Sequence, residues 1–145
     1  MLRSFCGKRD TSEGEAKARY SSAVIAGTVM MVSDDYEKEE ARKRMILYSS
    51  NEQINQIARS GVAFQPEESA GTSASRVYSA IIDNKKYLAL FHWSNTAEFM
   101  SVSTRECGLP EHLICKELWT GKTLEMTGEI QWWFDGCDAA ILEIE

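Results

Sequence analysis

The chain has 145 residues, a formal net charge of −6, 43% hydrophobic residues and 26% charged residues. These values are typical of a globular protein with one or two small domains and exclude a disordered tail. The acidic balance argues against nucleic acid as the main partner, and no apolar run of about 18 residues predicts a membrane span.

The first residues predict a loop and then a capped helix. Met1–Thr11 is rich in Gly, Lys, Arg and Asp, and no apolar region follows Met1 as it would in a signal peptide. We therefore expect a cytoplasmic location, unless the true N-terminus is missing and leaves the compartment unknown. Ser12 and Glu15 form a capping box, so a helix is predicted over Ser12–Ala26, with Gly27 ending it.

The next stretch predicts a buried strand. Thr28–Val32 is an apolar run without polar alternation, which is typical of a strand covered on both faces. Such a strand needs parallel neighbours, because its backbone groups cannot stay unpaired in a core. Asp34 and Asp35 follow it and are expected to cap a helix over Tyr36–Ser50.

A change of composition predicts a domain boundary. Asn51 is expected to cap a third short helix that ends at Gly61. Pro66 and the Ser/Gly/Ala-rich stretch Glu68–Ser75 then interrupt the helical pattern. The predicted organisation is a first unit over residues 1–66, a linker over 67–75 and a second unit over 76–145.

From Arg76 onward the hydrophobic period is two, which predicts strands. Arg76–Ile82 and Lys86–Ser94 are joined by a tight turn at Asp83-Asn84-Lys85, and the second strand is apolar on both faces, so it should be central. Five further strands are predicted at Glu98–Thr104, Leu113–Trp119, Thr123–Thr127, Glu129–Phe134 and Asp138–Ile144. Short strands with turn residues between them favour an antiparallel β-sandwich.

The cysteines, histidines and tryptophans give weaker indications. The four cysteines form no CxxC pair and the two histidines have no ligand-like spacing, so we expect free thiols, no metal and no cofactor. Tryptophan faces suit the apolar face of a sugar, but core packing is the more common role. Trp132 and Trp133 point to opposite faces of one strand, so one can be core and the other exposed.

Several motifs resemble the C-terminal part of α-galactosidase-like (melibiase-type) glycoside hydrolases. Leu88–Ser94 is similar to a strand of that family's C-terminal β domain, Glu117–Gly121 to its "aspartate-leucine-tryptophan-threonine-glycine" turn, and Ala139–Leu142 to its closing strand. Ala23–Asp35 resembles the last helix, glycine and strand of the family's (β/α)8 barrel, and Arg42–Ala58 the helices that close it.

The resemblance implies an α+β chain: a helix-strand-helix remnant of a (β/α)8 barrel followed by an antiparallel β-sandwich. It implies a fragment of a retaining enzyme for α-linked galactosides or related sugars, with carbohydrate as the partner of the full-length protein. The nucleophile and the acid/base lie on earlier barrel strands of the family, so no catalytic residue is expected here and the chain alone should be inactive. The strand left without neighbours could also cause self-association.

Substrate-binding residues are expected where the last barrel strands end, because the C-terminal ends of barrel strands carry the active site. The candidates are Met1, Arg3, Asp34 and Asp35. Asp34 and Asp35 are adjacent and so point to opposite sides, which prevents them from flanking one glycosidic bond as a catalytic pair must.

A second hypothesis is a free-standing β-sandwich module that binds carbohydrate or another protein without catalysis. The predicted buried parallel strand in the first 60 residues favours the enzyme fragment, since a binding module has no use for such a strand.

Overall fold

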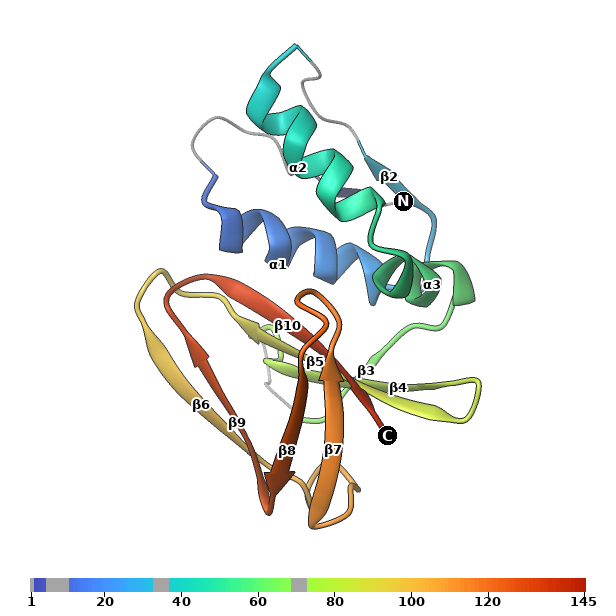
Figure 1. The fold of residues 1–145 in the computed structure, drawn as a ribbon, viewed down its shortest axis with the longest axis vertical. Coiled ribbons are helices and arrows are strands. Elements are labelled where there is room, and N and C mark those ends of the chain that lie inside the picture. The colour runs from blue at the N-terminus through green and yellow to red at the C-terminus, as the bar shows by residue number, and fades with distance from the viewer. Residues whose placement is uncertain (1, 5–10, 33–36, 69–72) are drawn as a thin grey trace.

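The computed structural model describes residues 2–4, 11–32, 37–68 and 73–145. In chain order the elements are β1 (Leu2–Ser4), α1 (Glu13–Val24), β2 (Met30–Val32), α2 (Glu39–Ser49), α3 (Glu52–Ser60), β3 (Gln65–Pro66), β4 (Val77–Ile82), β5 (Lys85–His92), β6 (Glu98–Ser103), β7 (His112–Glu117), β8 (Thr123–Thr127), β9 (Glu129–Phe134) and β10 (Asp138–Ile144). The protein is α+β: the helices lie together on one side and strands β3 to β10 on the other (Figure 1).

Side-chain caps fix the starts of α1 and α3. The Ser12 hydroxyl accepts a hydrogen bond from the Glu15 backbone N–H at 3.1 Å, as the capping box predicts. The Asn51 side chain accepts from the Ile54 N–H at 3.1 Å, and α3 ends at Gly61, whose φ of 69° is left-handed. The sequence-based prediction of these caps is confirmed.

The predicted start of α2 is wrong. The helix begins at Glu39 with Lys38 as N-cap, and the Lys38 side chain makes no capping hydrogen bond. Asp34 and Asp35, which were predicted to cap this helix, lie outside the described part of the chain. Glu39 and Glu40 in the first turn supply the negative charge that a helix N-terminus favours.

The strands form three sheets. A six-stranded sheet has the order β3-β4-β5-β10-β7-β8 with antiparallel neighbours throughout, and β6 pairs antiparallel with β9 in a small second sheet. The third sheet is the parallel pair β1-β2. The six-stranded sheet is the middle layer, because the helices pack on one of its faces and the β6-β9 sheet on the other.

Strand β5 is buried on both faces, which confirms its predicted central place. Phe91 and Ala89 belong to the core shared with the helices, where they meet Tyr20 and other residues of α1 and α3. Leu88 and Leu90 belong to the core shared with the β6-β9 sheet. All four β5 side chains are 0% exposed, so the alternation of this strand divides its apolar residues between two cores.

The bounds of most predicted strands agree with the structure. Asp83 and Asn84 have φ of 50° and 64° and form the two-residue turn between β4 and β5. Strands β8, β9 and β10 have the predicted bounds, whereas β7 ends at Glu117 instead of Trp119. The strand stops there because Glu117 N–H bonds the Lys122 carbonyl and the chain turns.

The N-terminal segment is a strand where a loop was predicted. Leu2–Ser4 forms β1 and pairs in parallel with β2, with Leu2 opposite Met30 and Ser4 opposite Val32. The predicted loop is therefore wrong at these residues, while a strand next to Thr28–Val32 agrees with its apolar pattern. Strand β3, just before the expected boundary, pairs with β4 in the large sheet.

Candidate functional site

The parallel pair β1-β2 holds the predicted substrate-binding region. Arg3 lies in the middle of β1 opposite Met31, and the C-terminal ends of both strands lie side by side because the pair is parallel. Met1, Asp34 and Asp35 lie outside the described residues. The structure thus brings the two strand ends together and leaves the four candidates otherwise as sequence-based expectations.

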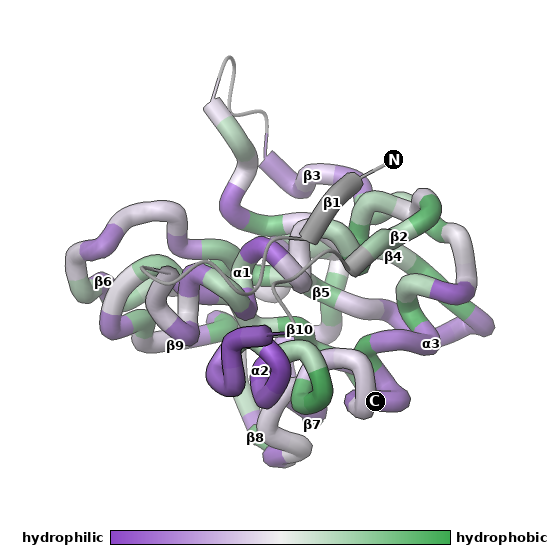
Figure 2. Tube along the Cα trace, turned by 90° about the horizontal axis from the view of Figure 1, so that it is seen from above, coloured by the Kyte–Doolittle hydropathy of each residue, from purple (hydrophilic) through white to green (hydrophobic). Residues whose placement is uncertain are grey.

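Large apolar side chains are exposed at this pair and, separately, on helix α2. Val29, just before β2, is 69% exposed, and Met31 within β2 is 42% exposed. Ile46 and Leu47 of α2 are also exposed, after first turns that are strongly hydrophilic (Figure 2). Within the described residues no strand pairs with the second edge of β1 or of β2. A parallel pair of this kind is usually covered and flanked by further strands.

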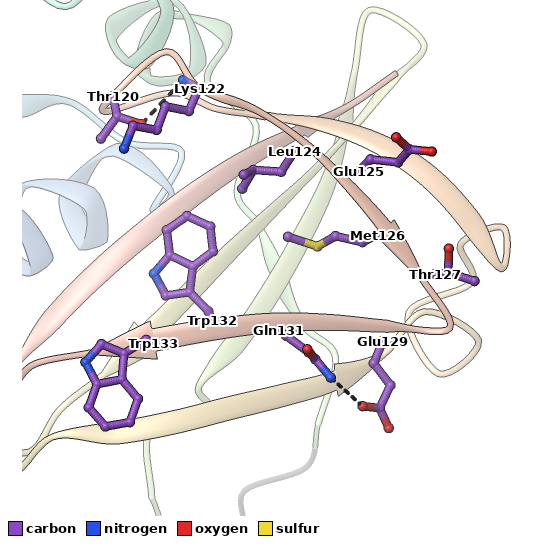
Figure 3. A pocket seen from close by; sticks show the side chains of 10 residues that line it. All are labelled: Thr120, Lys122, Leu124, Glu125, Met126, Thr127, Glu129, Gln131, Trp132 and Trp133. Carbon is purple, nitrogen blue, oxygen red and sulfur yellow. Dashed lines mark hydrogen bonds between the residues drawn. The ribbon is translucent and has the colours of Figure 1, made fainter.

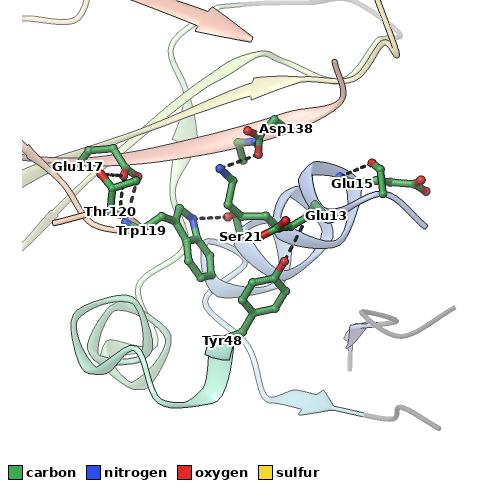
Figure 4. Close-up of polar contacts among 11 residues, drawn as sticks. Glu13, Glu15, Ser21, Tyr48, Glu117, Trp119, Thr120 and Asp138 are labelled. Atoms are coloured by element: carbon green, nitrogen blue, oxygen red, sulfur yellow. Dashed lines mark hydrogen bonds and ion pairs between the residues drawn. The ribbon is translucent and has the colours of Figure 1, made fainter. Parts of the chain in front are cut away.

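A buried carboxylate closes the turn after β7 (Figure 4). Glu117 is 2% exposed, and its oxygens accept hydrogen bonds from Trp119 N–H at 3.0 Å, from Thr120 N–H at 2.7 Å and from the Thr120 hydroxyl at 2.7 Å. Three donors compensate the cost of burying the charge. The geometry makes Glu117 a structural carboxylate. The sequence motif identified this turn but did not indicate what its acid does.

Trp119 joins this turn to the helices. Its indole N–H donates to the Ser21 hydroxyl of α1 at 3.0 Å, and its ring lies 5.8 Å from that of Tyr20 and 5.2 Å from that of Tyr48 (Figure 4). Asn51 adds a hydrogen bond from its side-chain amide to the Leu118 carbonyl at 2.9 Å. The helices and the sandwich are therefore connected by specific polar contacts as well as by the shared core.

The four tryptophans divide evenly: Trp119 and Trp132 are partly buried against the cores, whereas Trp93 and Trp133 are exposed, so core packing of most of them, as predicted, is not found. Trp93 stacks on Phe91 at a centroid distance of 4.6 Å, and Trp132 packs against the core between the sheets. Trp133, its neighbour, is 57% exposed. Indole surface is therefore accessible to a ligand at Trp133 and also at Trp93, which is 42% exposed.

The remaining reactive side chains have structural surroundings. His92 contacts Glu98 through Nδ1 at 3.0 Å and the Thr96 carbonyl through Nε2 at 2.6 Å. Cys107 and Cys115 are buried free thiols, and burial raises the pKa of both. In the described ranges no group of three or more His, Cys, Asp or Glu side chains could hold a metal ion, and no described helix is long and apolar enough to cross a membrane.

The architecture is that of the C-terminal part of α-galactosidase-type glycoside hydrolases. The chain is similar to an α-galactosidase from Saccharomyces cerevisiae (TM-score 0.79, 10% identity, 99% of this chain and 46% of that one). It is also similar to α-galactosidase I from Mortierella vinacea (TM-score 0.77, 12% identity, 94% of this chain and 36% of that one). No known family model and no curated protein matches the sequence.

Enzymes with other substrates share the same fold. An isomalto-dextranase from Arthrobacter globiformis T6 in complex with panose has a TM-score of 0.76 and 19% identity, over 92% of this chain and 24% of that one. A β-L-arabinopyranosidase from Geobacillus stearothermophilus has a TM-score of 0.76 and 13% identity, over 92% and 30%. The chain spans less than half the length of each of these enzymes.

Proposed function

We propose that this chain is the C-terminal part of a retaining, α-galactosidase-like glycoside hydrolase that acts on α-linked galactosides or related sugars. The observation that carries this proposal is the parallel pair β1-β2, which lies against α1, while α1 packs on the large antiparallel sheet, in a fold similar to that of α-galactosidases. In this interpretation β1 and β2 are the last two strands of a (β/α)8 barrel.

The outer edges of β1 and β2, unpaired within the described part of the chain, support the proposal that they come from a barrel. Each strand has one partner among the described residues, and the apolar Val29 and Met31 at β2 face solvent. Backbone groups and apolar side chains of this kind are stable in a core only when further strands cover them. The missing strands and helices of a barrel are partners that fit this geometry.

The roles that we propose for this chain and for the rest of the barrel follow from the chemistry of retaining hydrolysis. That chemistry needs two carboxyl groups about 5–5.5 Å apart, one as nucleophile and one as acid/base. We assign both to the part of the barrel that precedes this chain. Residues at the ends of β1 and β2, with Met1, Arg3, Asp34 and Asp35 as candidates, would contribute only to the binding of the sugar.

Activity assays on two forms of the protein test this proposal. The pure chain should not hydrolyse an aryl α-galactoside. If the DNA upstream of residue 1 continues in frame through a barrel with two strand-end aspartates, the extended protein should hydrolyse it, and changing either aspartate to Asn should abolish the activity. Hydrolysis by the pure chain that is lost in Asp34→Asn or Asp35→Asn would contradict the proposal.

A further inference from the structure

A groove of about 610 Å³ opens between β8 and β9 and extends from Thr120 and Lys122, beside the helices, to Thr127 and Glu129 (Figure 3). Among the described residues β8 is the last strand of the six-stranded sheet and β9 pairs with β6 alone, so both have a free edge at this groove. The two strands meet at Gly128 and diverge from there. Leu124, Met126 and Trp132 form the floor, partly buried against the core between the sheets.

An aromatic platform lies on the outer face of the β6-β9 pair, on the opposite side of β9 from this floor (Figure 3). Trp133 is 57% exposed and stands directly across the β6-β9 pair from Phe99, which is 54% exposed. The Trp133 indole N–H donates to Asp135 Oδ1 at 2.7 Å. This bond occupies the polar edge of the indole and holds the ring in place, so its apolar face is what the side chain offers to a ligand.

Hydrogen-bonding side chains continue the same face along β9. Residues 129, 131 and 133 alternate with the buried positions of the strand, so they share the outer face and extend over about 13 Å. The Glu129 carboxylate accepts hydrogen bonds from the Ser101 hydroxyl at 2.7 Å and from the Gln131 amide at 3.3 Å. These bonds lower the pKa of Glu129 and fix an ionised acceptor that has lone pairs left for a ligand.

We propose that the outer face of the β6-β9 pair, made of Phe99, Glu129, Gln131 and Trp133, binds a neutral oligosaccharide. An indole face held in place suits the apolar face of a pyranose, while carboxylate and amide groups suit its hydroxyls. The carboxylates of Glu129 and of Asp135, which accepts from the Trp133 indole, give this face negative charge, which disfavours anionic glycans. All these residues belong to the sandwich, so the inference does not rest on the proposed enzymatic function.

Affinity electrophoresis of the full chain in native gels tests the proposal, with dextran and galactomannan as neutral probes and carboxymethyl-dextran as an anionic one. Both the wild type and Ile81→Ala, which truncates a 67% exposed side chain on β4, should be retarded by at least one neutral probe. Trp133→Ala should raise the half-retarding concentration about tenfold or more, as truncation of a central tryptophan does at binding sites. Trp133→Tyr, which keeps a platform, should stay within about threefold of the wild type.

Gln131→Ala provides a second arm that leaves the aromatic platform intact, and it should weaken retardation about threefold through the lost hydrogen bonds. Circular dichroism should show all variants folded, because the substituted side chains are exposed. Three results would overturn the inference: no retardation of the wild type by either neutral probe, equal weakening by Ile81→Ala and Trp133→Ala, or stronger retardation by carboxymethyl-dextran. The first is also the result expected if a peptide strand added to the edge of β8 is the true ligand.

Discussion

Glu117 is a buried carboxylate whose oxygens bond groups of its own turn. One oxygen accepts from Trp119 N–H and the other from the backbone N–H and hydroxyl of Thr120. The Thr120 hydroxyl can rotate toward another acceptor, whereas the two backbone N–H groups are fixed and each needs one of the two carboxylate oxygens. A change that keeps the size of this side chain therefore tests the hydrogen bonds alone.

We expect Glu117→Gln to lower the free energy of unfolding by about 1–3 kcal/mol, because the new amide NH₂ faces donors and leaves one of them unsatisfied in a buried site. Urea denaturation followed by circular dichroism would measure the loss. Glu111→Gln is the matched control, since Glu111 is exposed and the same change there should stay within about 0.5 kcal/mol. Equal values for the two variants would mean that the turn does not depend on the carboxylate.

The buried thiol of Cys107 should make the free energy of unfolding depend on pH in the alkaline range. Burial raises the pKa of this thiol from 9.0 to about 11. Below pH 9 the thiol keeps its proton in both states, and as pH rises from 9 to 11 the unfolded chain releases the proton while the folded chain retains it. Stability should therefore fall across this window, and the fall in urea midpoint should be smaller in Cys107→Ala. An identical fall in both proteins would contradict the assignment.

Local sequence predicts the contacts and the backbone conformation of a residue well where its partners are a few positions away. The caps at Ser12 and Asn51 and the left-handed Gly61 each depend on neighbours within one helical turn, and the structure confirms them. The contact between Trp119 and Ser21 spans 98 positions, so no local pattern could indicate it. The partners of Glu117 are only two and three positions away, but the motif gives residue types and does not show which donors bond the buried carboxylate.

At the scale of elements, long alternating strands were predictable and short ones were not. β5 has enough residues to display its burial pattern, whereas β1 and β3 have three and two. Such short strands exist because a neighbouring strand pairs with them, as β2 does with β1 and β4 with β3. The start of α2 was missed because Asp34 and Asp35 are good capping residues in sequence, although the helix begins after Lys38.

Gly27 and Gly61 form a matched pair at the junctions of these elements. Both have left-handed φ, 65° and 69°, but a Cβ at Gly27 would lie 2.4 Å from the Ala63 backbone nitrogen, whereas nothing lies within 4 Å of one at Gly61. Alanine should cost about 1–2 kcal/mol at Gly61 from backbone strain alone. At Gly27 a further 1–3 kcal/mol should follow from the clash.

Thermal and urea unfolding of the two glycine variants would separate these contributions. The chain between α1 and β2 meets the segment after α3 at Gly27, where the Phe64 N–H also bonds the Ile25 carbonyl at 2.9 Å. A cost at Gly27 no larger than at Gly61 would mean that this junction can open without loss, and that the two segments are not packed as closely as their distances indicate.

At the scale of the whole molecule, the division into two units stays a prediction, while the structure shows how the helices and the sheets pack. The pattern of β5 indicated burial on both faces, but it could not tell that one face is covered by the helices and the other by the β6-β9 sheet. The candidate sugar-binding residues stay predictions, because Met1, Asp34 and Asp35 lie outside the described residues. The sequence predicted that one of Trp132 and Trp133 can be exposed but not which one, and the structure identifies it as Trp133.

The open parallel pair leads to the last prediction, which concerns hydrogen exchange. β5 pairs with β4 and β10 and is buried on both faces, whereas β2 has β1 as its partner among the described residues and exposes Met31. Amides of Met30–Val32 should therefore exchange at least about tenfold faster than those of Tyr87–Phe91 in dilute protein. If the free edge of β2 self-associates, its exchange should slow as the protein concentration rises, while that of β5 stays constant. Equal, strong protection of both strands in a dilute monomer would mean that β2 has all its partners within this chain. The proposal of a barrel fragment would then have to be replaced by that of a complete small α+β domain.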